Sequence, residues 1–153
     1  RGERNPLFSL AYLALKHSGA LDWNTGLGLS LSHQGNQHYI EFHHIFPKAE
    51  LRKRGYERSE INEIANMAFV SGRANRRISN KLPSIYFPKL ISERGAEALS
   101  AQAIPSDKSL WEIENYRSFL AARQALLEQR INAFVDASVA RGQASELDDS
   151  DRI

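Results

Sequence analysis

Three short segments near the middle of the chain carry the residues best suited to chemistry. The first, 41–47, holds two adjacent histidines, His43 and His44, and it is followed by Asn66 and by Asn75 nine positions later. An imidazole nitrogen and a carboxamide oxygen can bind a divalent cation. A second imidazole, with an ordinary pKa near about 6.5, can take a proton from water at neutral pH. A metal, a base and surrounding arginines together suit phosphodiester hydrolysis.

These side chains can meet only if strands and a helix position them. Residues 38–42 alternate as a strand does, and Pro47, which cannot donate a ladder hydrogen bond, places the two histidines at a strand end. Residues 67–70 predict a second strand, and 71–80 a polar helix with three arginines. If that helix packs across the strands, His43, His44 and Asn75 converge. Neighbouring strand residues point to opposite faces, so the two histidines share a site only where the strand ends or bulges.

The remaining pattern is mostly helical. Asn5 and Pro6 suit the start of a helix that ends near Gly19, and Ser59 can cap a helix that runs to Ala65. Pro83 and Pro88 are expected to break the chain into short pieces. The other expected elements are a loop over 22–37, short helices over 49–54 and 93–103, a long helix over 109–141 that Gly142 ends, and a disordered acidic tail over 143–153.

Length and composition limit the classes of protein. The chain has 153 residues, 42% of them apolar and none cysteine, which predicts one domain with its own core. The lack of cysteine excludes a disulfide scaffold, Cys-ligated zinc, iron–sulfur sites and a cysteine nucleophile. We find no apolar run long enough for a membrane span. Because the chain begins at Arg1, we expect a piece of a longer cytoplasmic protein.

Charge is unevenly distributed along the chain. Residues 48–94 contain 11 Lys and Arg against 5 Asp and Glu, a net charge of +6, whereas the rest carries 9 against 13, a net charge of −4. A basic middle suits a polyanion, because cations that neutralise phosphates release counterions. An ordinary solvated basic surface would look the same, so charge alone only permits a nucleic-acid partner.

The central segments resemble the HNH (ββα-metal) endonucleases. The run His43-His44-Ile45-Phe46-Pro47 is followed by Asn66, Asn75 and a basic helix, as in that family. The flanking segments narrow the resemblance to the C-terminal nuclease region of GmrSD-type, modification-dependent restriction proteins. These segments are Leu13-Ala14-Leu15-Lys16, Asp22-Trp23, Asn80-Lys81-Leu82-Pro83 and the stretch from Tyr116 through Phe119-Leu120 to Arg123. The resemblance spans residues 5–141, and its specific part is 41–82.

This resemblance implies a role for each motif residue. His44 corresponds to the general base and His43 to a metal ligand, Asn66 holds the loop and the base, and Asn75 is the last metal ligand. Arg76 is the preferred contact to the phosphate or the transition state. The residues expected to bind nucleic acid are Arg73, Arg76, Arg77 and Lys81. The implied products carry a 5′-phosphate and a 3′-hydroxyl.

The implied cofactor is a divalent metal, with Mg²⁺ expected first. Because His43 stands where the family commonly has a carboxylate, Mn²⁺, Ni²⁺ or Zn²⁺ remain possible. The implied fold is α+β and mostly helical: a small ββα-metal core with a two-stranded hairpin, surrounded by helices and ending in a long C-terminal helix. The nuclease domain would span 1–142, divided into a lead-in over 5–37, the core over 38–82 and helical support over 83–142.

The implied protein is a metal-dependent DNA endonuclease of a restriction or phage-defence system. Its partners would be DNA, modified and phage-derived, and an N-terminal nucleotide-hydrolysing domain of the parent protein, with no membrane. Two other classes stay open. One is a DNA-binding module with an inactive HNH core. The other is a helical interaction domain with structural zinc, for which His33, His38 and His43 form an approximate ladder.

Overall fold

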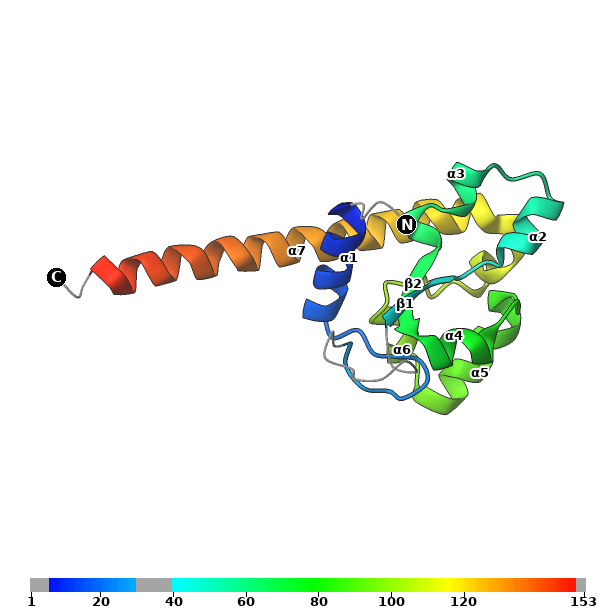
Figure 1. Cartoon of the computed structure of the whole chain (residues 1–153), viewed down its shortest axis with the longest axis horizontal. Helices are drawn as coiled ribbons and strands as arrows, with labels where there is room; N and C mark the ends of the chain where they lie inside the picture. Colours follow the sequence, from blue (N-terminus) through cyan, green and yellow to red (C-terminus); the bar gives the residue numbers. More distant parts are fainter. Residues whose placement is uncertain (1–5, 30–39, 151–153) are drawn as a thin grey trace.

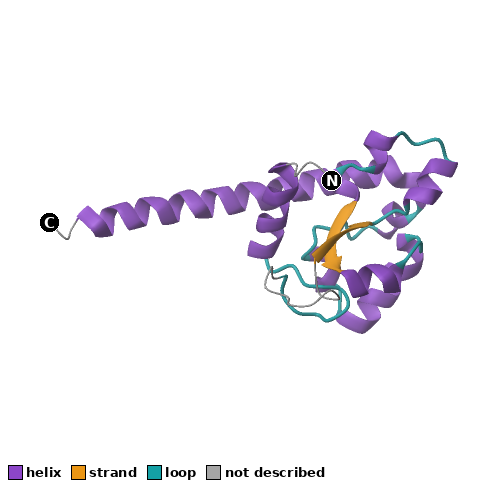
Figure 2. Ribbon diagram, viewed as in Figure 1, coloured by secondary structure: helices purple, strands orange, loops and turns teal. Residues whose placement is uncertain are grey.

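The computed structural model describes residues 6–29 and 40–150, and its architecture is mostly helical around a small antiparallel sheet. Figures 1 and 2 show two short strands within a helical body and one long helix that runs out of it. This confirms the predicted mixture of helices, a two-stranded antiparallel pair and a long C-terminal helix. Asn5, His33 and His38 lie outside the described residues, so the predicted helix cap and histidine ladder are not placed.

Apart from residues 18–39 between α1 and β1, the elements follow one another with short connections. The strands are β1 (Ile40–His44) and β2 (Met67–Ser71). The helices are α1 (Pro6–His17), α2 (Lys48–Lys53), α3 (Arg58–Ile61), α4 (Gly72–Ile78), α5 (Pro83–Arg94), α6 (Glu97–Ser100) and α7 (Tyr116–Ser150), with single 3₁₀ turns η1 (Ile64–Asn66), η2 (Lys108–Trp111) and η3 (Ile113–Asn115).

Strands β1 and β2 pair antiparallel, and every residue of β2 is buried. The register places Phe42 opposite Phe69, His43 opposite Ala68 and His44 opposite Met67. The far edge of β2 is covered by the side chain of Gln102, which accepts from the Phe69 amide at 3.3 Å and donates to the Phe69 carbonyl at 2.6 Å. A glutamine amide thus replaces the hydrogen bonds that a third strand would make.

A buried carboxylate ties the segment after α1 to the start of α4. Asp22, 1% exposed, accepts hydrogen bonds from the Ser71 amide at 2.7 Å and from the Thr25 amide at 2.9 Å, and it also binds both hydroxyl groups. Burial by itself raises the pKa of Asp22, but these bonds outweigh it and hold the pKa below its ordinary value. Ser71 in turn accepts from the Ala74 amide and caps α4.

The core joins the sheet connection to α7 through aromatic rings. Phe46, which follows β1, contacts Tyr116 and Phe119 of α7 edge-on, with ring centroids 5.2 and 5.0 Å apart. All three side chains are fully buried. Helix α1 crosses α7, as Figure 1 shows, and packs on the sheet through Tyr12, whose ring lies 5.4 Å from that of Phe69. The segment that carries His43 and His44 is therefore anchored in the main core rather than on a loose loop.

Helix α7 does not end at Gly142, so that prediction is wrong. The helix continues to Ser150 and projects beyond the body of the fold (Figure 1). Its surroundings explain this: Ala140, Arg141, Gln143 and Ala144 favour a helix, and one internal glycine costs only about 1 kcal/mol. Across residues 6–29 and 40–150, no helix combines the length and apolarity needed to cross a bilayer.

Two predicted helix boundaries also need correction. Pro88 does not break the chain, because α5 is continuous from Pro83 and buries Tyr86, Phe87 and Leu90 while Pro88 stays exposed. Burial of this face outweighs the one backbone hydrogen bond that Pro88 removes. The expected helix over 93–103 is instead interrupted at Gly95, whose φ is 85°, a value that glycine adopts readily.

The third correction concerns the short helix α3. Ser59 does not cap it; Glu57 does, in a capping box in which Glu57 and Glu60 each bind the other's backbone amide. The helix then stops at Ile61, and the separate turn η1 precedes β2. The expected single helix from Ser59 to Ala65 is therefore two short turns.

Arg123 of α7 is the largest buried polar side chain in the described part of the fold. It is 0% exposed, and its guanidinium donates to the carbonyls of Ile64, Ala65, Met67 and Gln102 at 2.7–3.2 Å. Burial lowers the pKa of Arg123 to about 9, so the group remains a cation at neutral pH. These bonds fix the turn before β2 to α7.

We predict that Arg123→Met lowers the free energy of unfolding by about 3 kcal/mol or more, because four backbone carbonyls, three of them in buried hydrogen bonds, lose their donor. Urea denaturation measures the change. Arg141→Met, at an exposed position of the same helix, is the matched control and should change stability by less than about 0.5 kcal/mol. Equal effects of the two substitutions would contradict the structural role of Arg123.

Candidate functional site

The end of β1 and the helix after β2 bring His43 and Asn75 into direct contact. His43 Nδ1 lies 2.8 Å from Asn75 Oδ1, although the residues are 32 positions apart. The antiparallel pairing puts His43 beside Ala68, and α4 begins directly after β2 and carries Asn75 back over the sheet. The expected convergence of these two side chains is therefore present in the structure.

Glu41 sets the orientation of the Asn75 amide. Asn75 Nδ2 donates to Glu41 Oε2 at 2.8 Å, so the amide oxygen is the atom that faces His43. Gly72 makes room for this carboxylate, because a Cβ at position 72 would lie 2.6 Å from Glu41 Oε1 and 3.2 Å from Arg76 Nη1. The glycine at the start of α4 thus lets Glu41 and Arg76 lie against the helix.

Tyr86 of α5 contacts the other side of the His43 ring. Its hydroxyl oxygen lies 3.1 Å from the Ile45 carbonyl and 3.4 Å from His43 Nε2. When the hydroxyl donates to Ile45, its oxygen can only accept from His43, so Nε2 carries the ring proton and Nδ1 presents a lone pair to Asn75 Oδ1. Two lone pairs 2.8 Å apart repel each other, so this tautomer is favoured only when a cation lies between them. The opposite tautomer instead donates from Nδ1 to Asn75.

His43 is held neutral in this environment. It is 2% exposed, and burial lowers its pKa to about 4, more than the hydrogen bond to Asn75 raises it; the neighbouring His44 lowers it a little further. The rings of Trp23 and Tyr86 pack edge-on against the imidazole. A neutral imidazole is the form that binds metals, so His43 needs no deprotonation at neutral pH.

His44 has a different partner and is only half-buried. Its Nε2 donates to Asn62 Oδ1 at 3.0 Å, which leaves the Nδ1 lone pair free. Burial lowers the pKa of His44, the bond to Asn62 opposes this, and the charges of Lys48 and Arg52 lower the pKa further. Both histidines belong to β1, but their side chains have different partners, as strand alternation requires, so His44 does not join the contact of His43 with Asn75 as was expected from the sequence.

Asn66 fixes the loop that leaves β1. It is 0% exposed; its Oδ1 accepts from the Phe46 amide at 2.9 Å, and its Nδ2 donates to the carbonyls of Phe46 at 3.2 Å and Ile61 at 3.0 Å. The backbone continues this link, because the Ile45 amide donates to the Asn66 carbonyl at 2.8 Å. Asn66 therefore holds the chain on both sides of Pro47 but does not contact His44.

The cations of the α4 region are arranged less uniformly than their sequence suggests. Arg77 donates two hydrogen bonds to Glu93 of α5, both at 2.7 Å, and Lys81 donates to the Arg77 carbonyl at 3.2 Å. Arg73 and Arg76 are exposed on α4. Arg77, one of the four residues predicted to bind nucleic acid, is thus already paired with a carboxylate.

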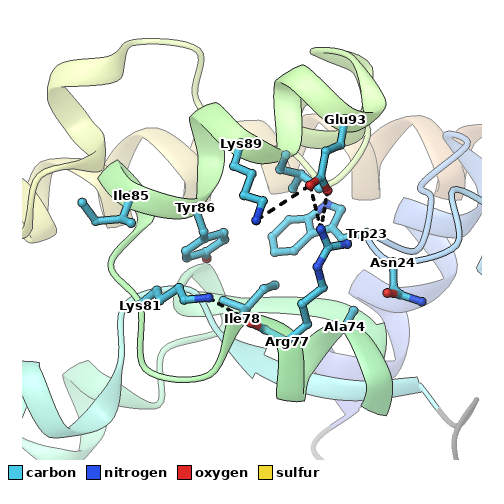
Figure 3. Close-up of a pocket in the computed structure, with 11 residues that line it drawn as sticks. Trp23, Asn24, Ala74, Arg77, Ile78, Lys81, Ile85, Tyr86, Lys89 and Glu93 are labelled. Atoms are coloured by element: carbon cyan, nitrogen blue, oxygen red, sulfur yellow. Dashed lines mark hydrogen bonds and ion pairs between the residues drawn. The ribbon is translucent and has the colours of Figure 1, made fainter.

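A cavity of about 290 Å³ separates α4 from α5 and lies above Trp23 and Tyr86. Figure 3 shows Arg77 and Glu93 meeting across it, with Lys89 beside Glu93 and Lys81 on the opposite side of the opening. Tyr86 belongs both to this cavity and to the surroundings of His43. Glu93 is the single carboxylate among four charged lining residues, so the opening keeps a net positive charge.

The donors that the structure brings together fit a divalent cation as part of its shell. Two ligands at right angles around an ion, each about 2.1 Å from it, lie about 3.0 Å apart, close to the observed separation of His43 Nδ1 and Asn75 Oδ1. One nitrogen and one oxygen suit Mn²⁺ or Ni²⁺ as well as Mg²⁺. Within 6–29 and 40–150, no three His, Asp or Glu side chains cluster around a possible metal position. An ion held by His43 and Asn75 would therefore need further ligands from outside these side chains.

Three contact residues were not predicted from the sequence: Glu41, Asn62 and Tyr86. Glu41 lies directly before the histidine motif, and its acidity was the only signal available. Asn62 follows α3 and would be taken for an ordinary helix end, since Asn62 has no fixed spacing to the motif. Tyr86 lies between two prolines in a segment expected to be broken.

Comparison with known proteins adds one partial likeness. A stretch of 61 residues, 40% of this chain, is 36% identical to the uncharacterized protein MJ0686 of Methanocaldococcus jannaschii. The stretch covers 10% of MJ0686, so this chain spans about a tenth of that relative's length. No family model matches the chain, and no solved structure matches it.

We predict that the pH dependence of stability reports the neutral state of His43. The unfolded chain takes up this proton near pH 6.5 and the folded chain only near pH 4, so stability falls as the pH is lowered through that interval. Between pH 6.5 and 4 the wild type should lose about 3 kcal/mol more than His43→Asn, whose amide does not titrate. Urea denaturation at several pH values measures this, and parallel curves for the two proteins would contradict it.

Proposed function

We propose that this chain is the nuclease domain of a metal-dependent DNA endonuclease, with a ββα-metal core formed by β1, β2 and α4. The observation that carries the proposal is the 2.8 Å approach of His43 Nδ1 to Asn75 Oδ1, with His44 next to it on the same strand. Strand, strand and helix occur in the order that the resemblance to HNH endonucleases requires. The basic residues on α4 and α2 supply the charge that a polyanionic substrate needs.

His44 is the general base in this proposal. Because Nε2 donates to Asn62, Nδ1 has the lone pair that accepts a proton from water. The water oxygen forms a new bond to phosphorus, and the bond from phosphorus to the 3′ oxygen breaks. The 3′ oxygen leaves and takes up a proton, which gives a 5′-phosphate and a 3′-hydroxyl. The low pKa of His44 keeps it unprotonated at neutral pH.

His43 and Asn75 would hold the divalent metal, most simply Mg²⁺, with Mn²⁺, Ni²⁺ or Zn²⁺ as alternatives that an imidazole ligand permits. When bound, such an ion supplies positive charge that stabilises the developing phosphate and leaving-group charges. Glu41 would orient Asn75, and Tyr86 would orient His43, each through a side-chain contact. Asn66 holds the loop in place, and Arg76 is the proposed phosphate contact on α4, where Arg73 and Lys81 bind the strand more loosely.

The wider biological role follows from the same resemblance and is proposed with it. The parent protein would be a cytoplasmic restriction or phage-defence protein, whose N-terminal domain hydrolyses a nucleotide and controls cleavage. Its substrate would be modified, phage-derived DNA. The alternatives are a DNA-binding module with an inactive core and a helical interaction domain with histidine-bound zinc.

We predict that His44→Ala lowers the rate of plasmid nicking by about 10²–10⁴-fold, because the general base is removed. The assay follows conversion of supercoiled plasmid with Mg²⁺, Mn²⁺ or Ni²⁺. His17→Ala, which removes a histidine that contacts Phe134 between α1 and α7, is the matched control and should keep wild-type activity. Nicking that survives His44→Ala unchanged would overturn the assignment of the base.

Salt-sensitive DNA binding without cleavage under every metal would favour the inactive module, and stoichiometric zinc whose removal unfolds the chain would favour the zinc domain.

Asn62 is predicted to be a positioning residue for His44. Asn62→Ala should lower kcat by about 10-fold and leave KM for DNA nearly unchanged, because the imidazole loses the acceptor that fixes its tautomer. Asn62→Asp keeps an acceptor at this position and should recover most of the rate. Steady-state nicking of a labelled duplex measures both values. Failure of Asn62→Asp to exceed Asn62→Ala would argue against positioning through this hydrogen bond.

A further inference from the structure

A second basic feature lies next to His44, on the connection between the strands rather than on α4. A pocket of about 280 Å³ is lined by Lys48 and Arg52 of α2, Arg58 and Ile61 of α3, and Tyr56 and Asn62 beside them. Asn62 is also the residue that accepts the hydrogen bond from His44 Nε2 at 3.0 Å. One wall of this pocket is therefore in direct contact with the proposed general base.

The three cations of this pocket differ from their neighbours in having no acidic partner. In the described ranges, none of Lys48, Arg52 and Arg58 lies within 4.0 Å of a carboxylate. Adjacent cations are paired instead: Lys53 with Glu50 at 2.6 Å, and Arg117 with Glu60 at 3.0 Å. In the run of basic residues after Leu51, only Arg52 lines the pocket. Lys53 and Arg54 are instead paired with Glu50.

Unpaired like charges around one pocket repel each other, and an anion that binds there relieves the repulsion. Lys48, Arg52 and Arg58 are all exposed, and arginine forks and a flexible lysine suit phosphate oxygens. Exposed side chains of this kind bind the backbone of a polynucleotide through counterion release. A free phosphate would instead favour a closed set of buried donors, which this pocket does not offer.

We propose that Lys48, Arg52 and Arg58 bind a backbone phosphate of the DNA strand, close to the phosphodiester that His44 acts on. This inference rests on the proposed function and deepens it, because it locates the substrate on α2 and α3 as well as on α4. Asn62 then has two neighbours: the base on one side and the bound strand on the other. Placement of the strand and orientation of the base are coupled through a single side chain.

The test is DNA binding by the whole chain in EDTA, which prevents cleavage, measured by fluorescence anisotropy with a labelled duplex over a range of salt concentrations. The triple variant Lys48→Gln/Arg52→Gln/Arg58→Gln should bind at least about 10-fold more weakly at 0.1 M salt. Its plot of log affinity against log salt should be less steep by about 1, since each lost phosphate contact removes about 0.9 from the slope.

The matched control is Lys53→Gln/Lys89→Gln/Arg117→Gln, which removes the same charge from residues that are paired with carboxylates. It should keep nearly wild-type affinity and slope, and circular dichroism should show both variants folded. Equal losses of DNA affinity in the two variants would show that only net charge matters and would overturn the proposal. A pocket variant that binds DNA as tightly as the wild type would also overturn it.

Two further measurements distinguish a DNA site from a free-phosphate site, and failure of the DNA site from failure of the nuclease proposal. Displacement of the duplex by inorganic phosphate at concentrations where chloride of equal ionic strength has no effect would identify a free-phosphate site and overturn the assignment to a DNA strand. Because binding is measured without a metal, loss of affinity in the pocket variant together with a wild type that never nicks plasmid would support the DNA site and reject the nuclease.

Discussion

The buried guanidinium of Arg123 is the constraint on which the geometry of the site depends. A fully buried cation without a carboxylate needs hydrogen-bond acceptors, and here backbone carbonyls accept from both terminal nitrogens of the guanidinium, while Nε is left without a partner. The carbonyls bound by Nη1 belong to the turn and the first residue of β2, so α7 fixes where the second strand begins. Asn66 lies inside this turn, and its carboxamide then fixes Phe46 and the end of β1. A helix far along the chain thereby determines where the histidines lie.

From this anchored frame, carboxamides orient both imidazoles. Asn75 faces His43 through its oxygen because Glu41 occupies its nitrogen, and Asn62 accepts from His44. The two rings are neighbours in the chain but differ in burial and in partners, since a strand directs successive side chains to opposite faces. One ring is enclosed among Tyr86 and Trp23, and the other borders an open basic pocket. A single strand end thus presents one buried, neutral imidazole and one more accessible imidazole.

The sequence predicted those parts of this arrangement that local pattern controls. Both strands were expected from short β-favouring runs, and the approach of His43 to Asn75 followed from the direct connection between β2 and α4. The contacts of Asn62 and Tyr86 could not be predicted, because they depend on how α3 and α5 pack, 18 and 43 positions away from their histidine partners. Helix α5 was missed for a related reason: the burial of its aromatic face outweighs Pro88, and only tertiary structure shows that face.

The surface charges show the same limit of prediction from the sequence. The net charge of +6 between residues 48 and 94 is a property of the sequence, but ion pairs decide which cations remain available to a ligand. Arg77 looked suited to phosphate because it lies on the helix with Asn75, yet Glu93 takes up its guanidinium. Arg52 is one of three consecutive basic residues, yet it borders a pocket that Lys53 and Arg54 do not line. Carboxylates distributed among the cations thus leave unpaired positive charge in two places among the described residues, beside His44 and on the α4 region.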